Sequence, residues 1–158
     1  MKARLELDRS ESAMTDCVRK TALLVLAAPA TTLAADYASP YGEWRGETQY
    51  QAFVRGVADP AAHVVTNLTI AISPGGKVSG SSTKNGCRFV GLATPGIAPA
   101  IVNLSVTLTG CNYPGLNRTY AGDLSVFGKE RYAKFSLQAI DTTSGKGGTY
   151  NITSTMRR

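Results

Sequence analysis

The chain has 158 residues, with 17 lysines and arginines against 11 aspartates and glutamates, and a formal net charge of +6 at pH 7. This length suits one domain, and the basic residues are scattered rather than gathered into the stripe with interleaved aromatics that indicates a nucleic-acid surface. We therefore expect no nucleic-acid partner.

Residues 1–35 have the pattern of a cleaved secretory signal peptide. Arg19 and Lys20 precede an apolar run over residues 21–28, and Pro29 and a stretch of small residues follow it. Basic, apolar and small residues in that order are typical of such signals, and the run is much shorter than the roughly 20 apolar residues that cross a bilayer. A buried core helix is the alternative interpretation of this run.

Signal cleavage is expected after Ala34 or Ala35, which leaves a single mature domain over residues 36–158. Translation from Met14 would give a shorter and more regular signal than translation from Met1. We expect a periplasmic or secreted protein that has no membrane anchor after cleavage.

Two cysteines remain in the mature chain, because Cys17 lies before the apolar run and is removed with it. Paired cysteines are the rule in an oxidising compartment, so we predict a disulfide between Cys87 and Cys111. Their midpoint falls at residue 99, in a loop between two strand patterns, and a hairpin about that loop brings the cysteines nearly opposite each other. Two free buried thiols are the alternative.

Strand patterns dominate the chain from residue 42 onward, and no stretch shows a convincing helical period. The alternating segments are residues 43–54, 63–73, 77–82, 84–92, 100–111, 118–127, 132–140 and 149–156. Short turns rich in Gly, Pro and Asn separate them. The predicted fold is therefore all-β, an antiparallel meander of about seven or eight strands. Such strands must close on themselves or stack as two sheets, and we favour a small closed barrel over a sandwich.

The apolar face of each strand predicts the core. In the first strand this face carries Trp44, Gly46, Thr48 and Tyr50. In the later strands the inward-facing residues are expected to include Leu68, Ile70, Ile72, Val102, Leu104, Val106, Leu108, Phe135 and Leu137.

The sequence offers no recognisable catalytic set. His63, the single histidine, lies at the start of a strand, where we expect a solvated side chain, and the G-x-S-x-G motif of serine hydrolases is absent. The carboxylates that could form an acid–base pair, Glu43, Glu47, Asp123 and Asp141, are better interpreted as surface charges. We predict no catalytic residue, no metal ligand and no cofactor, and hence no enzyme.

Three tyrosines beside prolines or in loops are candidates for contact with a protein partner. Tyr37 and Tyr41 flank Pro40 in an irregular segment, and Tyr113 precedes Pro114 in a loop. Exposed tyrosines on loops are common in protein interfaces. Packing against the end of the barrel is the alternative interpretation.

The motif Gly42-x-Trp44-x-Gly46 on the first strand, followed by a meander, resembles the start of calycins, the group of barrels that includes lipocalins and avidins. Lipocalin likeness implies a carrier of small apolar ligands. Avidin-type biotin sites use several tryptophans, and this chain has one. The layout is also similar to small exported bacterial proteins of unknown function, with N-G-C-x-F-x-G at residues 85–91, T-G-C at 109–111 and Y-x-G at 120–122.

These observations favour an exported, non-enzymatic binding protein that acts on a protein partner in the cell envelope, as inhibitor and immunity proteins do. The alternatives are a lipocalin-like carrier of a small apolar ligand and a structural or surface-associated envelope protein. An open lumen lined by apolar residues would favour the carrier. A lumen filled by Trp44, Leu68, Leu104 and Phe135 would favour the protein partner.

Overall fold

The computed structural model describes residues 39–142 and 147–158 of the chain, so the predicted signal peptide and Tyr37 lie outside the described residues. The barrel strands are β1 (Gly42–Val54), β3 (Val64–Ile72), β4 (Lys77–Ser82), β5 (Arg88–Pro95), β6 (Ile101–Thr109), β7 (Thr119–Phe127), β8 (Tyr132–Asp141) and β9 (Gly148–Arg157). A two-residue strand, β2 (Val57–Ala58), pairs with the end of β1. Three short 3-10 turns, η1 (Pro60–Ala62), η2 (Pro114–Leu116) and η3 (Gly128–Glu130), lie in the connections.

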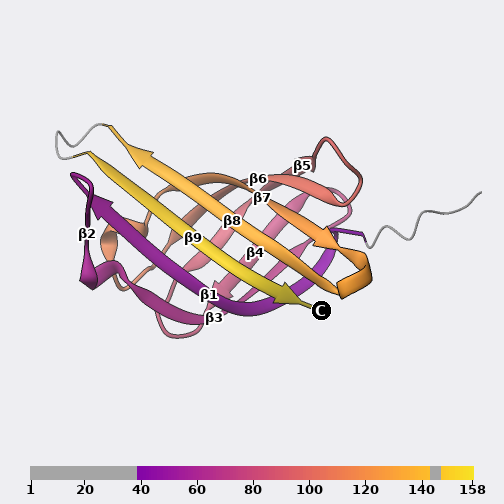
Figure 1. The fold of residues 1–158 in the computed structure, drawn as a ribbon, viewed down its shortest axis with the longest axis horizontal. Coiled ribbons are helices and arrows are strands. Elements are labelled where there is room, and N and C mark those ends of the chain that lie inside the picture. The colour runs from indigo at the N-terminus through magenta and orange to yellow at the C-terminus, as the bar shows by residue number, and fades with distance from the viewer. Residues whose placement is uncertain (1–38, 143–146) are drawn as a thin grey trace, which may run out of the picture. The chain divides into compact units, whose positions relative to one another are not determined.

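The prediction of a closed antiparallel barrel is confirmed. Each of the eight long strands pairs with the next along the chain, and β9 pairs with β1 over ten residues from Arg45↔Arg157 to Val54↔Gly148. Figure 1 shows β1, β9 and β8 side by side across the near wall. Closure leaves no free edge among the eight strands, which protects them from pairing with other chains.

Successive connections place the loops at two ends of the barrel. One end, called here the N-terminal end, holds the start of β1, the β3–β4, β5–β6 and β7–β8 connections and Arg158. The opposite end, called here the disulfide end, holds η1, the β4–β5 turn, η2, the end of β8 and the start of β9.

The predicted disulfide is present at the second of these ends. Cys87 and Cys111 lie just beyond the last β5–β6 pair, Arg88↔Thr109, with their Cα atoms 4.1 Å apart. Both cysteines are buried. The bond fastens the β4–β5 turn to the β6–β7 loop, and it is compatible with an oxidising, exported compartment.

The barrel interior is filled by side chains from all eight strands. Tyr50, Phe89, Tyr120 and Phe135 are the largest of the fully buried side chains, each less than 2% exposed. Leucines, isoleucines and valines from alternate strand positions occupy the space between them, as the two-residue period predicts. Among the described residues, no helix is long and apolar enough to span a bilayer.

Inward-facing glycines let neighbouring strands approach where a larger side chain would not fit. Gly122 on β7 pairs with Leu104 of β6 and Leu137 of β8, and a Cβ atom added there would overlap the carbonyl oxygen of Ser136. Glycine at such positions allows a strand to bend sharply, as a small barrel requires.

Candidate functional site

At the N-terminal end of the barrel, Trp44 and Arg158 line a hollow of about 270 Å³. The indole Nε1 of Trp44 donates a hydrogen bond to the carbonyl of Pro40 at 2.8 Å, and the guanidinium of Arg158 lies 4.5 Å from the ring centre. The same guanidinium donates to the carbonyls of Ser39 and Tyr41. Trp44 is 2% exposed, so the prediction that it belongs to the core is confirmed.

The disulfide end is closed by its loops. Tyr113 Oη donates to Asp59 Oδ2 at 2.7 Å, which joins the β6–β7 loop to the η1 turn. Asn112 joins the same loop to the β4–β5 turn, because its backbone N–H donates to the Asn85 carbonyl and its side-chain amide donates to the Lys84 carbonyl. These contacts hold three connections together over the barrel.

A second set of contacts at this end surrounds Arg118. Its guanidinium lies 3.6 Å from the ring centre of Tyr150 and 3.3 Å from a carboxylate oxygen of Asp141. Its Nε also donates to the Gly115 carbonyl at 2.6 Å. Both charged side chains of the ion pair are about one-fifth exposed, so Arg118 serves to hold the loop against the strands.

Three tyrosines at this end have a raised side-chain pKa. The hydrogen bond to Asp59 raises the pKa of Tyr113 to about 12, because ionising the phenol would place two negative charges side by side. Burial raises the pKa of Tyr120, whose hydroxyl donates to the Leu116 carbonyl, and also raises the pKa of Tyr50.

The tyrosines expected to contact a partner do not form one surface. Tyr41 lies at the N-terminal end and Tyr113 at the disulfide end, and both are half-buried and packed against the core. Tyr41 and Tyr113 are thus less exposed than expected, because Tyr41 belongs to the segment beside Trp44 and Tyr113 is held by Asp59, and their contact with a partner stays a prediction. Tyr37 lies outside the described residues.

The residues considered for catalysis are separated. His63 is exposed, with Nε2 3.1 Å from Gln49 Nε2. Glu43 pairs with Arg45 at 2.5 Å on β1, and Asp123 accepts from the Ser125 hydroxyl at 2.8 Å on β7. Asp141 pairs with Arg118. Within residues 39–142 and 147–158, no group of three histidine, cysteine or acidic side chains could hold a metal ion.

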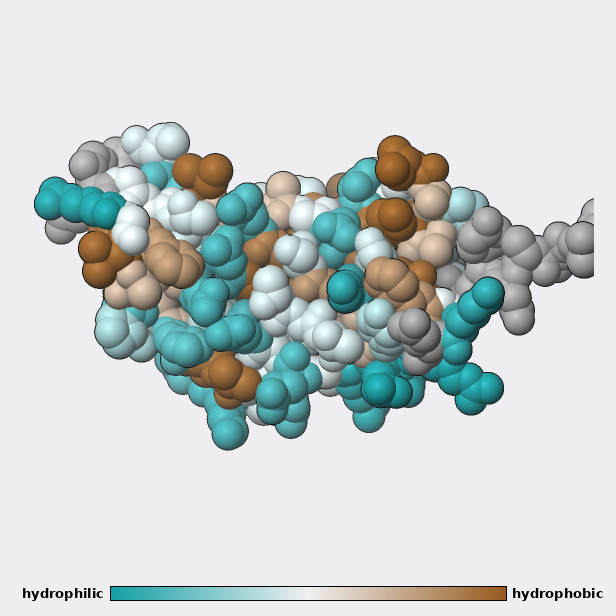
Figure 2. Space-filling model, in the orientation of Figure 1, coloured by the Kyte–Doolittle hydropathy of each residue, from teal (hydrophilic) through white to brown (hydrophobic). Residues whose placement is uncertain are grey.

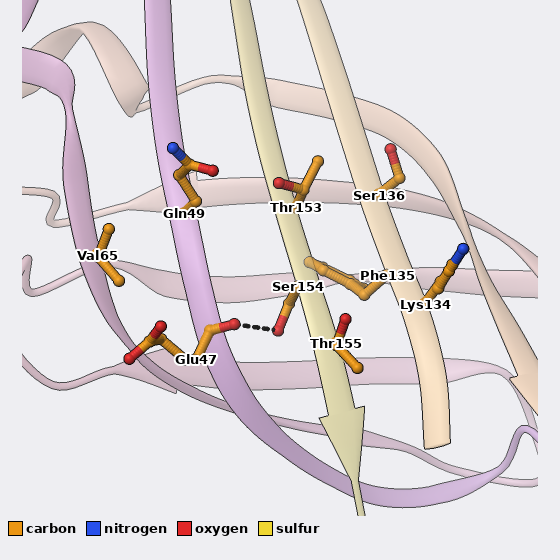
Figure 3. Close-up of a pocket in the computed structure, with 9 residues that line it drawn as sticks. All are labelled: Glu47, Gln49, Val65, Lys134, Phe135, Ser136, Thr153, Ser154 and Thr155. Carbon is orange, nitrogen blue, oxygen red and sulfur yellow. Dashed lines mark hydrogen bonds between the residues drawn. The ribbon is translucent and has the colours of Figure 1, made fainter. Parts of the chain in front are cut away.

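A hollow of about 500 Å³ lies on the outer wall over β9 (Figure 3). Short side chains of β9 form its floor, while Glu47 of β1 and Lys134 of β8 flank Thr155 from the two neighbouring strands. The Ser154 hydroxyl donates to the Glu47 carbonyl at 2.7 Å. Because this partner is a main-chain carbonyl and not a base, the arrangement does not activate the serine as a nucleophile.

This wall is a solvated surface that presents hydrogen-bonding side chains. Figure 2 shows the same face covered mainly by hydrophilic and neutral residues, with apolar residues in separate places. The hollow can offer hydroxyl and amide groups to a ligand, but it has no exposed aromatic ring on which a sugar or base could stack.

The opposite wall is different in character. Three strands lie between β5 and β9 in either direction around the barrel, so β5 faces away from the hollow. On its outer side Val90 and Leu92 are 59% and 63% exposed, and Ile97 is fully exposed in the loop that follows. Val90 is paired with Ser79 of β4 and Thr107 of β6. Leu92 is paired with Lys77 of β4 and Ser105 of β6.

Sequence reasoning missed this apolar strip because it assigned no inward and outward faces to the segment at residues 84–92. Phe89 takes the inward position, so Val90 and Leu92 must point outward. The run R-F-V-G-L contains apolar residues on both faces, and that lack of alternation was the available signal.

No family model, curated protein or solved structure matches the chain.

Proposed function

We propose that this protein is an exported, non-catalytic binding protein that acts on a protein partner in the cell envelope, in the manner of an inhibitor or immunity protein. The observation that carries this proposal is the filled lumen. Trp44, Leu68, Leu104 and Phe135 are all at most 3% exposed and belong to one continuous core. A barrel that carries a small ligand needs an internal or open-mouthed cavity for it.

The outside of the barrel is therefore the surface available for recognition. Rigid strands and loops held by a disulfide present this surface with little freedom to lose on binding. Export agrees with the disulfide, which persists in oxidising compartments.

Affinity capture tests the proposal. The purified protein is immobilised, with its disulfide intact, and exposed to envelope extract from the source cells. The control bait is the same protein after reduction, alkylation and unfolding. The proposal predicts that at least one envelope protein is retained by the folded bait and not by the control. Retention of only small apolar molecules, detected by extraction and mass spectrometry, would instead identify a carrier.

A further inference from the structure

The outer wall formed by β4, β5 and β6, together with the loop that follows β5, combines exposed apolar side chains with a one-sided charge. We propose that this surface, called here the β5 face, docks an acidic surface of a protein partner and inserts Ile97 into an apolar pocket of that partner. The inference rests on the proposed function and names the surface and the partner chemistry that serve it.

The loop at residues 96–100 presents Ile97 in a fixed position. The backbone N–H of Gly96 donates to the Ile101 carbonyl at 2.9 Å, and that of Ile101 donates to the Ala98 carbonyl at 2.9 Å. Pro95 and Pro99 on either side restrict the backbone further, since each proline fixes its own φ.

Because the backbone of this loop is already held, burial of Ile97 by a partner costs little backbone entropy, and the cost that remains is that of its side-chain rotamers. Central apolar anchors of this kind carry much of the binding energy of protein interfaces. Leu92 and Val90, on the outer side of β5, are the other exposed large apolar side chains of this wall. Single exposed apolar residues are ordinary on soluble proteins, and this wall carries three of them within eight residues of sequence.

The charge of the β5 face selects the partner. The chain has no aspartate or glutamate between Pro60 and Gly122, a stretch that includes all of β3, β4, β5 and β6. Exposed cations lie beside the apolar strip, because Lys77 is paired with Leu92 and Arg88 precedes Val90 on the same side of β5. A basic surface favours fast association with an acidic one.

Small hydroxyl side chains complete the surface. Ser79, Ser105 and Thr107 flank the apolar strip, and none of them is longer than the apolar side chain with which it is paired. The β5 face thus has an apolar centre with a polar and cationic margin, which is the usual arrangement of a protein interface.

The test compares variants on the β5 face with matched variants on the opposite side of the barrel. Ile97→Ser is paired with Ile140→Ser, since Ile140 is an exposed apolar residue of β8 at 68%. Lys77→Glu is paired with Lys134→Glu, since Lys134 is an exposed cation of β8. The captured envelope protein is purified, and its Kd and association rate for the wild type and each variant are measured by surface plasmon resonance at two salt concentrations.

We expect Ile97→Ser to raise Kd at least about tenfold, as removal of an anchor does. Lys77→Glu should slow association severalfold, and less so at high salt. Ile140→Ser and Lys134→Glu should change Kd by less than about twofold, and the partner should have an acidic contact surface. Circular dichroism melting of every variant verifies that the fold is intact.

The other outcomes are distinct. If the wild type retains no protein, the proposed function fails. If a protein is retained and the β5-face variants bind as tightly as the wild type, protein binding stands and the β5 face is wrong. If the wild type floats with phosphatidylglycerol vesicles and Ile97→Ser abolishes this flotation, the partner of the β5 face is a membrane surface and not a protein. If the wild type is a dimer and Ile97→Ser dissociates it, the partner of the β5 face is a second copy of this chain.

Discussion

At the scale of single residues, Trp44 is the large core side chain at the N-terminal end of the barrel. It is buried, donates to the Pro40 carbonyl and lies under the Arg158 guanidinium. Replacement by alanine removes a large apolar surface and leaves a cavity at the end of the core. We expect Trp44→Ala to lower the free energy of unfolding by about 3–5 kcal/mol, measured by urea denaturation. A loss under about 1 kcal/mol would mean that the indole contributes little to the core.

Tyr113 makes a prediction about alkaline pH. Its pKa is raised to about 12 by the hydrogen bond to Asp59, while the unfolded chain has the ordinary value of about 10. This contribution to stability is therefore complete below pH 10 and is lost as the pH rises from about 10 to 12, because the unfolded state releases its proton first.

The difference in absorbance at 295 nm between the wild type and Tyr113→Phe isolates this titration. We expect its midpoint near pH 12, and Asp59→Asn should move the midpoint down toward the ordinary value. A midpoint near 10 in the wild type would contradict the hydrogen bond.

At the scale of strands, Gly122 shows how the barrel depends on close approach. An added methyl group would overlap the Ser136 carbonyl on β8, so we expect Gly122→Ala to destabilise the barrel by about 1–3 kcal/mol. Gly75 is a matched control, since the nearest atom to an added Cβ there is 4.0 Å away. Thermal melting of the two variants provides the comparison, and equal melting temperatures would contradict the packing described for β7 and β8.

The disulfide joins connections that are far apart in the chain, with 24 residues of sequence separation. By the chain-entropy argument, a loop of this size contributes about 3.5 kcal/mol. The double variant Cys87→Ala, Cys111→Ala should therefore be less stable than the wild type by a similar amount in urea denaturation. Unchanged stability would show that the hydrogen bonds of Asn112 and Tyr113 hold this end without the disulfide.

The strands and the core could be predicted from the sequence because inward and outward positions alternate along most of them. The run from Ile101 to Thr109 is a good example, with Val102, Leu104, Val106 and Leu108 all buried as expected. Prediction failed where long-range contacts decide the outcome. Asp59 and Tyr113 are 54 residues apart, and no local pattern reveals that they meet. The outward strip on β5 was hidden for a related reason, since which apolar residue faces inward depends on the strand register.

At the scale of the whole molecule, the barrel is a solid scaffold with two different outer walls. The wall over β9 is polar and slightly hollowed, and the β5 face is apolar at its centre and free of carboxylates. Because the interior is occupied by the chain's own side chains, the proposed recognition of a partner would use the exterior.

Native mass spectrometry of the protein purified from the envelope without denaturant tests this account most directly. We expect the mass of the chain from about Asp36 to Arg158, less two hydrogen atoms for the disulfide, with no small molecule bound. A small ligand that is bound in stoichiometric amount and dissociates only on unfolding would contradict the filled lumen. It would identify the protein as a carrier.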